Sequence, residues 1–157
     1  MKNILKFLAV FSFVIILAGC TSKTEEKVVR CTLKLNDAAQ NYEIESVYNI
    51  YTDGSVVNKV ETTEVVTSDN NSVLDYFENY TNTLYTNMND AYGGYDFNIT
   101  KEDGKLISDT KIDYLKLDRE KLAKDQPTMK SYMNDDYMLT LEGIKSMYEQ
   151  MGATCEE

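Results

Sequence analysis

Hydrophobic and polar residues alternate along three stretches in the first half of the chain, which is the pattern of half-buried β-strands. These stretches are Val28–Leu35, Tyr42–Ile50 and Val56–Val66. Residues 36–40 form a polar turn between the first two, and Asp53-Gly54 lies between the second and third. Because glycine allows the positive φ of a tight turn, Asp53-Gly54 predicts a β-hairpin.

The hydrophobic pattern changes to helical spacing after residue 70. Ser72, with Asp75 three residues later, resembles a capping box with Asp in the place of Glu and predicts where the helix begins. Gly93-Gly94 predicts its end. The face expected to be buried is formed by Val73, Phe77, Tyr80, Leu84 and Met88.

The remaining residues predict another hairpin and two more helices. Tyr95–Ile99 and Leu106–Tyr114 read as strands on either side of Asp103-Gly104. Asp118–Lys124 can form a short helix, and Pro127 marks a break after it. The last helix is expected to begin at Thr140, to bury Leu141, Ile144, Tyr148 and Met151, and to stop at Gly152.

The element order β-β-β-α-β-β-α predicts an α+β fold. Strands joined by hairpins form antiparallel sheets, so we expect a mainly antiparallel sheet of about five strands with helices packed on one face. Residues 28–157 are long enough for one domain, and no linker divides them.

The first nineteen residues are typical of a lipoprotein signal peptide. Lys2 and Lys6 precede an apolar run of eleven residues, Leu8–Ala18, which is too short to span a bilayer. The run ends in Leu17-Ala18-Gly19-Cys20, which resembles a bacterial lipobox. We therefore expect cleavage between Gly19 and Cys20 and acylation of Cys20, for example with palmitate. The alternative is an uncleaved anchor helix in which the cysteine is incidental.

Such processing determines the expected setting of the protein. Cleavage removes 19 of the 157 residues, including two lysines and no acid, so 138 residues remain and the net charge changes from −10 to −12. An acidic chain lacks the basic surface that nucleic acids require. Residues 20–27 read as the lipidated cysteine and a polar tether, of which the seven residues after Cys20 reach only about 15 Å. The domain is therefore expected at the extracytoplasmic face of the cell membrane.

Two cysteines remain after Cys20 is assigned to the lipid. In an extracytoplasmic protein the even count favours a disulfide between Cys31 and Cys155. Two free thiols or an intermolecular bridge are the alternatives.

Composition restricts the possible chemistry. The chain has no histidine, which excludes histidine-based catalysis and histidine-ligated metals. No motif identifies a catalytic residue, a metal site or a cofactor. The twelve tyrosines are the most unusual feature. Six are expected to fill the core (Tyr42, Tyr48, Tyr80, Tyr95, Tyr114 and Tyr148), whereas others could form an exposed binding surface (Tyr51, Tyr85, Tyr92, Tyr132 and Tyr137).

These features together resemble the YehR-like family of small bacterial lipoproteins of unknown function. The matching residues are Leu17–Cys20, the strand that holds Cys31, Lys111–Asp118, and the end from Leu141 to Cys155. The resemblance implies an α+β fold and surface anchoring, and no catalytic residues.

We therefore expect a non-enzymatic, membrane-anchored module that binds a small ligand, a wall polymer or an envelope protein. One alternative is the accessory substrate-binding lipoprotein of a transporter. Another is a surface hydrolase that works with carboxylates alone.

Overall fold

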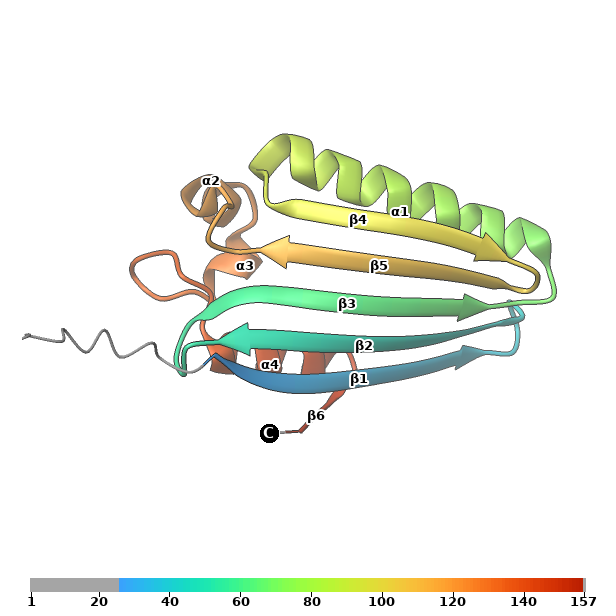
Figure 1. Cartoon of the computed structure of the whole chain (residues 1–157), viewed down its shortest axis with the longest axis horizontal. Helices are drawn as coiled ribbons and strands as arrows, with labels where there is room; N and C mark the ends of the chain where they lie inside the picture. Colours follow the sequence, from blue (N-terminus) through green and yellow to red (C-terminus); the bar gives the residue numbers. More distant parts are fainter. Residues whose placement is uncertain (1–25, 157) are drawn as a thin grey trace, which may run out of the picture.

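The computed structural model describes residues 26–156. The expected signal peptide, its cleavage site at Gly19-Cys20 and the lipidation of Cys20 lie outside these residues. The first three strands are β1 (Lys27–Asp37), β2 (Tyr42–Thr52) and β3 (Val57–Thr67), which pair in antiparallel order as a meander (Figure 1). Strand β1 begins at Lys27, which is the last residue of the segment expected to be the tether.

The second half of the chain also follows the predicted order. Helix α1 (Asn71–Tyr92) leads into the hairpin of β4 (Tyr95–Glu102) and β5 (Lys105–Asp113). Three shorter helices and a short strand complete the chain: α2 (Arg119–Asp125), α3 (Pro127–Lys130), α4 (Leu141–Gln150) and β6 (Thr154–Glu156).

The strands form one antiparallel sheet in the order β4-β5-β3-β2-β1-β6. The predicted α+β class is therefore confirmed, with six strands rather than about five. The additional strand β6 has three residues, too few to show a hydrophobic pattern, and it exists because Thr154–Glu156 pairs with Arg30–Thr32 of β1.

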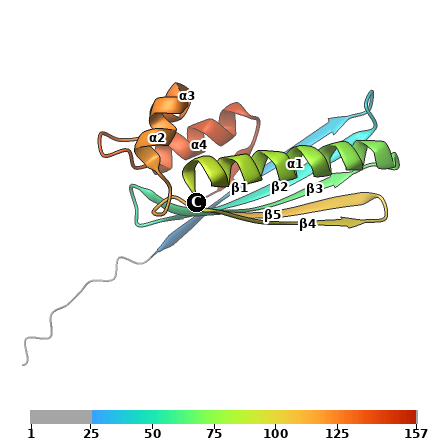
Figure 2. The same cartoon turned by 90° about the horizontal axis from the view of Figure 1, so that it is seen from above.

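All four helices lie on the same face of the sheet (Figure 2). The main hydrophobic cluster lies where α2, α3 and α4 cover the sheet and includes the fully buried Ile50, Leu139 and Ile144. A smaller cluster of Val66, Leu74 and Leu106 lies beneath the first turns of α1. Among the described residues, no helix covers the opposite face of the sheet.

Helix α1 differs from the prediction at its start. Its N-cap is Asn70, whose backbone is extended and whose side chain accepts a hydrogen bond of 3.0 Å from the Ser72 amide, so the predicted Ser72 cap is wrong. Asparagine is as good an N-cap as serine, and the two residues lie within one turn of each other.

The buried face of α1 also differs. The buried positions are Leu74, Thr81 and Tyr92, whereas Tyr80 and Leu84 are exposed. The prediction missed this face because Thr81 is polar. A polar residue at a buried position shifts the face that hydrophobic spacing predicts.

Helix α4 begins where predicted. The Thr140 side chain accepts a hydrogen bond of 3.0 Å from the Gly143 amide. Gly152 takes the expected left-handed conformation after the helix, with φ of 95°. Of the face expected to be buried, Ile144 and Tyr148 are buried, but Met151 is half exposed because the helix ends at that residue.

Candidate functional site

The two flanks of α1 have different partners. On one flank, Lys101 of the edge strand β4 forms ion pairs with Asp75 and Glu78. On the other, Phe77 meets Tyr42 of β2 edge to face, with ring centroids 5.1 Å apart. The first flank is therefore held by charges, and the second presents aromatic residues toward β2.

An exposed aromatic row runs along the second flank. Tyr76, Tyr80 and Leu84 are 63%, 54% and 38% exposed and lie four residues apart, so they form a single ridge along the helix. We call these three residues the tyrosine ridge. The rings of Tyr76 and Tyr80 are nearly parallel, with an interplanar angle of 14° and centroids 6.2 Å apart.

A shallow hollow lies on each side of this ridge. The first, of 470 Å³, lies between the β1–β2 turn and α1, where Gln40, Tyr42 and Ser72 join the ridge tyrosines. The second, of 460 Å³, lies along the outer surface of the helix and is lined by Tyr76, Asn79, Tyr80, Thr83, Leu84 and Asn87. Tyr76 and Tyr80 belong to both hollows, which makes them one continuous surface. None of the lining residues carries a charge.

A polar band separates the two hydrophobic clusters on the inner face of the sheet. Ser46, Ser108 and Thr110 are buried there, and the Ser46 hydroxyl donates a hydrogen bond of 3.0 Å to Glu64. Burial raises the pKa of Glu64, and the hydrogen bond from Ser46 opposes the shift only in part.

The uncovered face of the sheet carries a third hollow, of 370 Å³, over β3, β5 and β4. Its rim contains Glu61, Asp96, Asp109 and Lys111. The Glu61 carboxylate accepts hydrogen bonds from Lys59 and Tyr51, which lower its pKa. Within residues 26–156, no group of three or more acidic or cysteine side chains is arranged to hold a metal ion.

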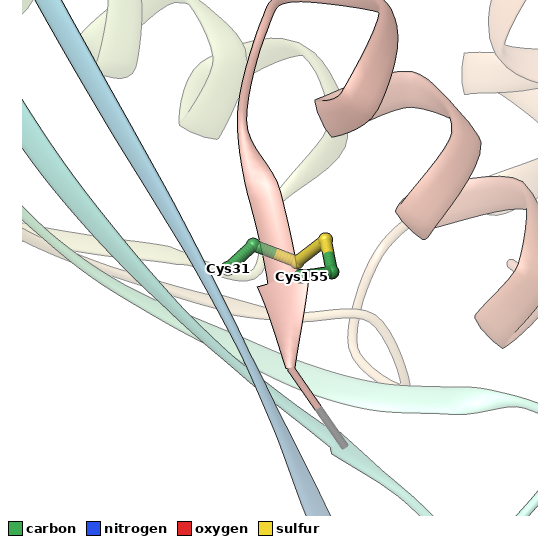
Figure 3. Close-up of a disulfide and its surroundings, with 2 residues drawn as sticks. All are labelled: Cys31 and Cys155. Atoms are coloured by element: carbon green, nitrogen blue, oxygen red, sulfur yellow. A yellow bond between two sulfur atoms is a disulfide. The ribbon is translucent and has the colours of Figure 1, made fainter.

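The predicted cysteine pair lies at the sheet edge, away from the hollows. Cys31 of β1 and Cys155 of β6 are directly paired across the two strands, and a disulfide joins them with their Cα atoms 4.0 Å apart (Figure 3). The bond fastens the three-residue strand β6 to the sheet and has a structural role.

The tyrosines are distributed differently from the expectation. Tyr48, Tyr114 and Tyr148 are buried as predicted, but Tyr80 is more than half exposed. Tyr92, expected at the surface, is buried at the last turn of α1. Tyr51, Tyr85, Tyr132 and Tyr137, also expected at the surface, are only partly exposed.

Tyr76 was not among the tyrosines predicted from the sequence, yet it is the most exposed large hydrophobic residue between residues 26 and 156. Its position four residues before Tyr80 was the available signal, since residues at this spacing share a helix face.

Comparison with known proteins supports the fold. No protein-family model matches the sequence, and no curated protein is similar to it. The structure is similar to the NMR structure of the E. coli YehR protein, with a TM-score of 0.51 and 15% sequence identity. The similarity covers 83% of this chain and 92% of that one. At this level of identity it shows a shared fold. In the part of the chain that the structure describes, no helix combines the length and apolar character needed to cross a bilayer.

Proposed function

We propose that this protein is a lipid-anchored, extracytoplasmic binding module of the bacterial cell envelope, related to the YehR-like lipoproteins. Its activity is binding rather than catalysis, and the tyrosine ridge is the binding surface. The observation that carries the proposal is the exposure of Tyr76 and Tyr80 on a domain whose other tyrosines are buried or half-buried. Large apolar rings at a surface cost free energy unless a partner covers them.

The anchor is supported by the sequence. Leu17-Ala18-Gly19-Cys20 follows an apolar run of signal-peptide length, and the described domain begins at residue 26, only six residues after Cys20. Two or three acyl chains on Cys20 would hold the protein firmly, whereas its acidic body would be repelled by anionic lipid.

The hydrolase alternative is less well supported. A hydrolase that uses only carboxylates needs two of them close together with separated pKa values. Glu64 has the raised pKa of a candidate acid, but burial and Ser46 account for its shift without a neighbouring carboxylate. Its position between the two hydrophobic clusters is that of a structural polar residue.

The transporter alternative is opposed by shape. Stand-alone solute receptors usually close two lobes around a ligand, whereas this chain folds as a single sheet with its helices on one face. The hollows beside the tyrosine ridge are shallow and open, which suits an extended partner better than an enclosed small solute.

Replacement of Cys20 tests the anchor. In bacterial cells that express the full chain, Cys20→Ala should move the protein from the membrane fraction to the soluble fraction, and mass spectrometry should show loss of the lipid. The matched control is Cys31→Ala/Cys155→Ala, which also replaces cysteines but keeps the lipobox and should stay in the membrane. Retention of Cys20→Ala in the membrane would contradict lipid anchoring.

A further inference from the structure

We propose that the tyrosine ridge and the two hollows beside it bind an uncharged saccharide chain. This inference rests on the proposed binding function and names the chemical class of the ligand.

The central part of α1 carries no charge. Residues 79–89 of α1 contain no Asp, Glu, Lys or Arg, although charged residues make up 27% of the chain. At that frequency a stretch of eleven would hold about three charges, yet this one has none although eight of its eleven residues are exposed, where charges are normally favoured. A surface without charges suits a ligand that brings none.

Aromatic rings and neutral polar groups lie side by side on this surface. The nearly parallel rings of Tyr76 and Tyr80 offer apolar faces on which the C–H face of a sugar ring can pack. Asn79, Thr83 and Asn87 on one side and Gln40 on the other supply amides and a hydroxyl that both donate and accept hydrogen bonds. Sugar hydroxyls and acetamido groups have the same dual character.

The surface is long enough for an extended ligand. The two hollows share Tyr76 and Tyr80, and their helical residues extend from Ser72 to Asn87. Fifteen residues of α-helix advance about 22 Å, so the surface fits an extended chain of several units rather than one small molecule. The tyrosine side chains lose little conformational entropy on binding, because they have few rotatable bonds.

The net charge disfavours the other occupants. At −10, the chain repels anionic polymers and a second copy of itself. A basic peptide would be attracted to the acidic rim around Glu61, Asp96 and Asp109 on the opposite face of the sheet rather than to the uncharged ridge.

Isothermal titration calorimetry on the full chain in detergent micelles tests the proposal. The uncharged probe is the tetramer of N-acetylglucosamine, and the anionic counterpart is tetragalacturonate. We expect the first to bind and the second to show no measurable heat. Tyr76→Ser/Tyr80→Ser should weaken binding at least tenfold, whereas Tyr76→Phe/Tyr80→Phe, which keeps the rings, should stay within about threefold of the wild type, one hydrogen bond to each hydroxyl being worth little.

The control for α1 is Asn82→Ser, an exposed position outside both hollows, which should bind as the wild type does. Circular dichroism confirms that each variant is folded. Lack of binding by the folded wild-type chain would overturn the proposal, as would binding that the serine variant leaves unchanged. A change from dimer to monomer in the serine variant, measured by sedimentation, would assign the ridge to self-association instead. None of these outcomes affects the Cys20→Ala result, so the ligand and the anchor are tested separately.

Discussion

Tyr48 of β2 and Tyr148 of α4 stack with their ring centroids 4.1 Å apart and their planes inclined by 23°. Both side chains are buried, and burial raises the pKa of each hydroxyl. The pair joins residues that lie one hundred positions apart in the chain and attaches the last helix to the middle of the sheet. It is therefore a major tertiary contact of the main hydrophobic cluster.

A double-mutant cycle measures this contact. Tyr48→Leu and Tyr148→Leu should each destabilise the protein, and their coupling energy should be about 0.5–1.5 kcal/mol, the range for stacked aromatic pairs. Urea unfolding of the wild type, the two single variants and the double variant provides the free energies of unfolding that the cycle compares. As a control, Tyr148→Leu combined with Leu74→Ala should be additive within about 0.5 kcal/mol, because Leu74 belongs to the other cluster. Additivity of the tyrosine pair would show that the stacking contributes nothing beyond burial.

Reduction of the disulfide should lower stability. The bond between Cys31 and Cys155 closes a loop with a sequence separation of 124, and removing it should cost up to about 5 kcal/mol through the entropy of the unfolded chain. The measurement is thermal unfolding with and without reductant. Cys31→Ala/Cys155→Ala should have the melting temperature of the reduced wild type, and reductant should not change it. A wild-type melting temperature that reductant does not change would mean that the two thiols are free.

Gly143→Ala should destabilise the protein even though alanine is the better helix former. Helix propensity alone predicts a gain of about 1 kcal/mol from this change. A β-carbon at position 143, however, would overlap the backbone carbonyl of Tyr132 and approach the Thr140 hydroxyl to 2.8 Å. We expect a net loss of about 1–3 kcal/mol, as for other overpacked sites. Glu149→Ala, at an exposed position of the same helix, is the control and should change stability by less than about 0.5 kcal/mol.

Glu64→Gln should stabilise the protein at neutral pH and have little effect in acid. Because burial raises the pKa of Glu64 in the folded state, ionisation destabilises the fold. The penalty is absent below the ordinary value of 4.5, grows as the pH rises through the folded-state pKa, and is complete above it. Glutamine can still accept the hydrogen bond from Ser46 without carrying a charge.

Melting temperatures of both proteins across the acid range test this prediction. The advantage of Glu64→Gln should disappear as the pH falls toward 4.5. Glu45→Gln, which changes an exposed carboxylate of β2, should show no such pH dependence beyond the loss of its surface ion pair with Lys34. An equal difference between Glu64→Gln and wild type at every pH would contradict the assignment of the effect to ionisation.

The local elements were predictable because their signals lie in neighbouring residues. Asp53-Gly54 and Asp103-Gly104 connect antiparallel strands as expected, with φ of 118° at Gly54 and 71° at Gly104. Thr140 marks the start of α4, because its side chain accepts a hydrogen bond from the Gly143 amide three residues later. Turns and caps of this kind depend on the conformation of a few consecutive residues, which the sequence states directly.

The candidate site was predictable only in part. The number of tyrosines suggested a binding surface, but the residues that form it are Tyr76 and Tyr80 rather than the five named from the sequence. The predicted buried face of α1 and the observed one both have helical spacing. The sequence alone does not show which of the two faces packs against the sheet. The structure places Leu74 and Thr81 against the sheet, and Tyr76 and Tyr80 are exposed as a consequence.

Local pattern and composition were enough to predict β1 to β5, the two Asp-Gly hairpins, the α+β class and the uncharged character of residues 79–89. Packing between distant segments places β5 beside β3 and pairs β6 with β1. Among residues 26–156, the same packing leaves Tyr76 and Tyr80 of α1 exposed. These features depend on contacts between segments far apart in the chain, whose free energies no local pattern encodes. The exposed tyrosine ridge is the result of that packing.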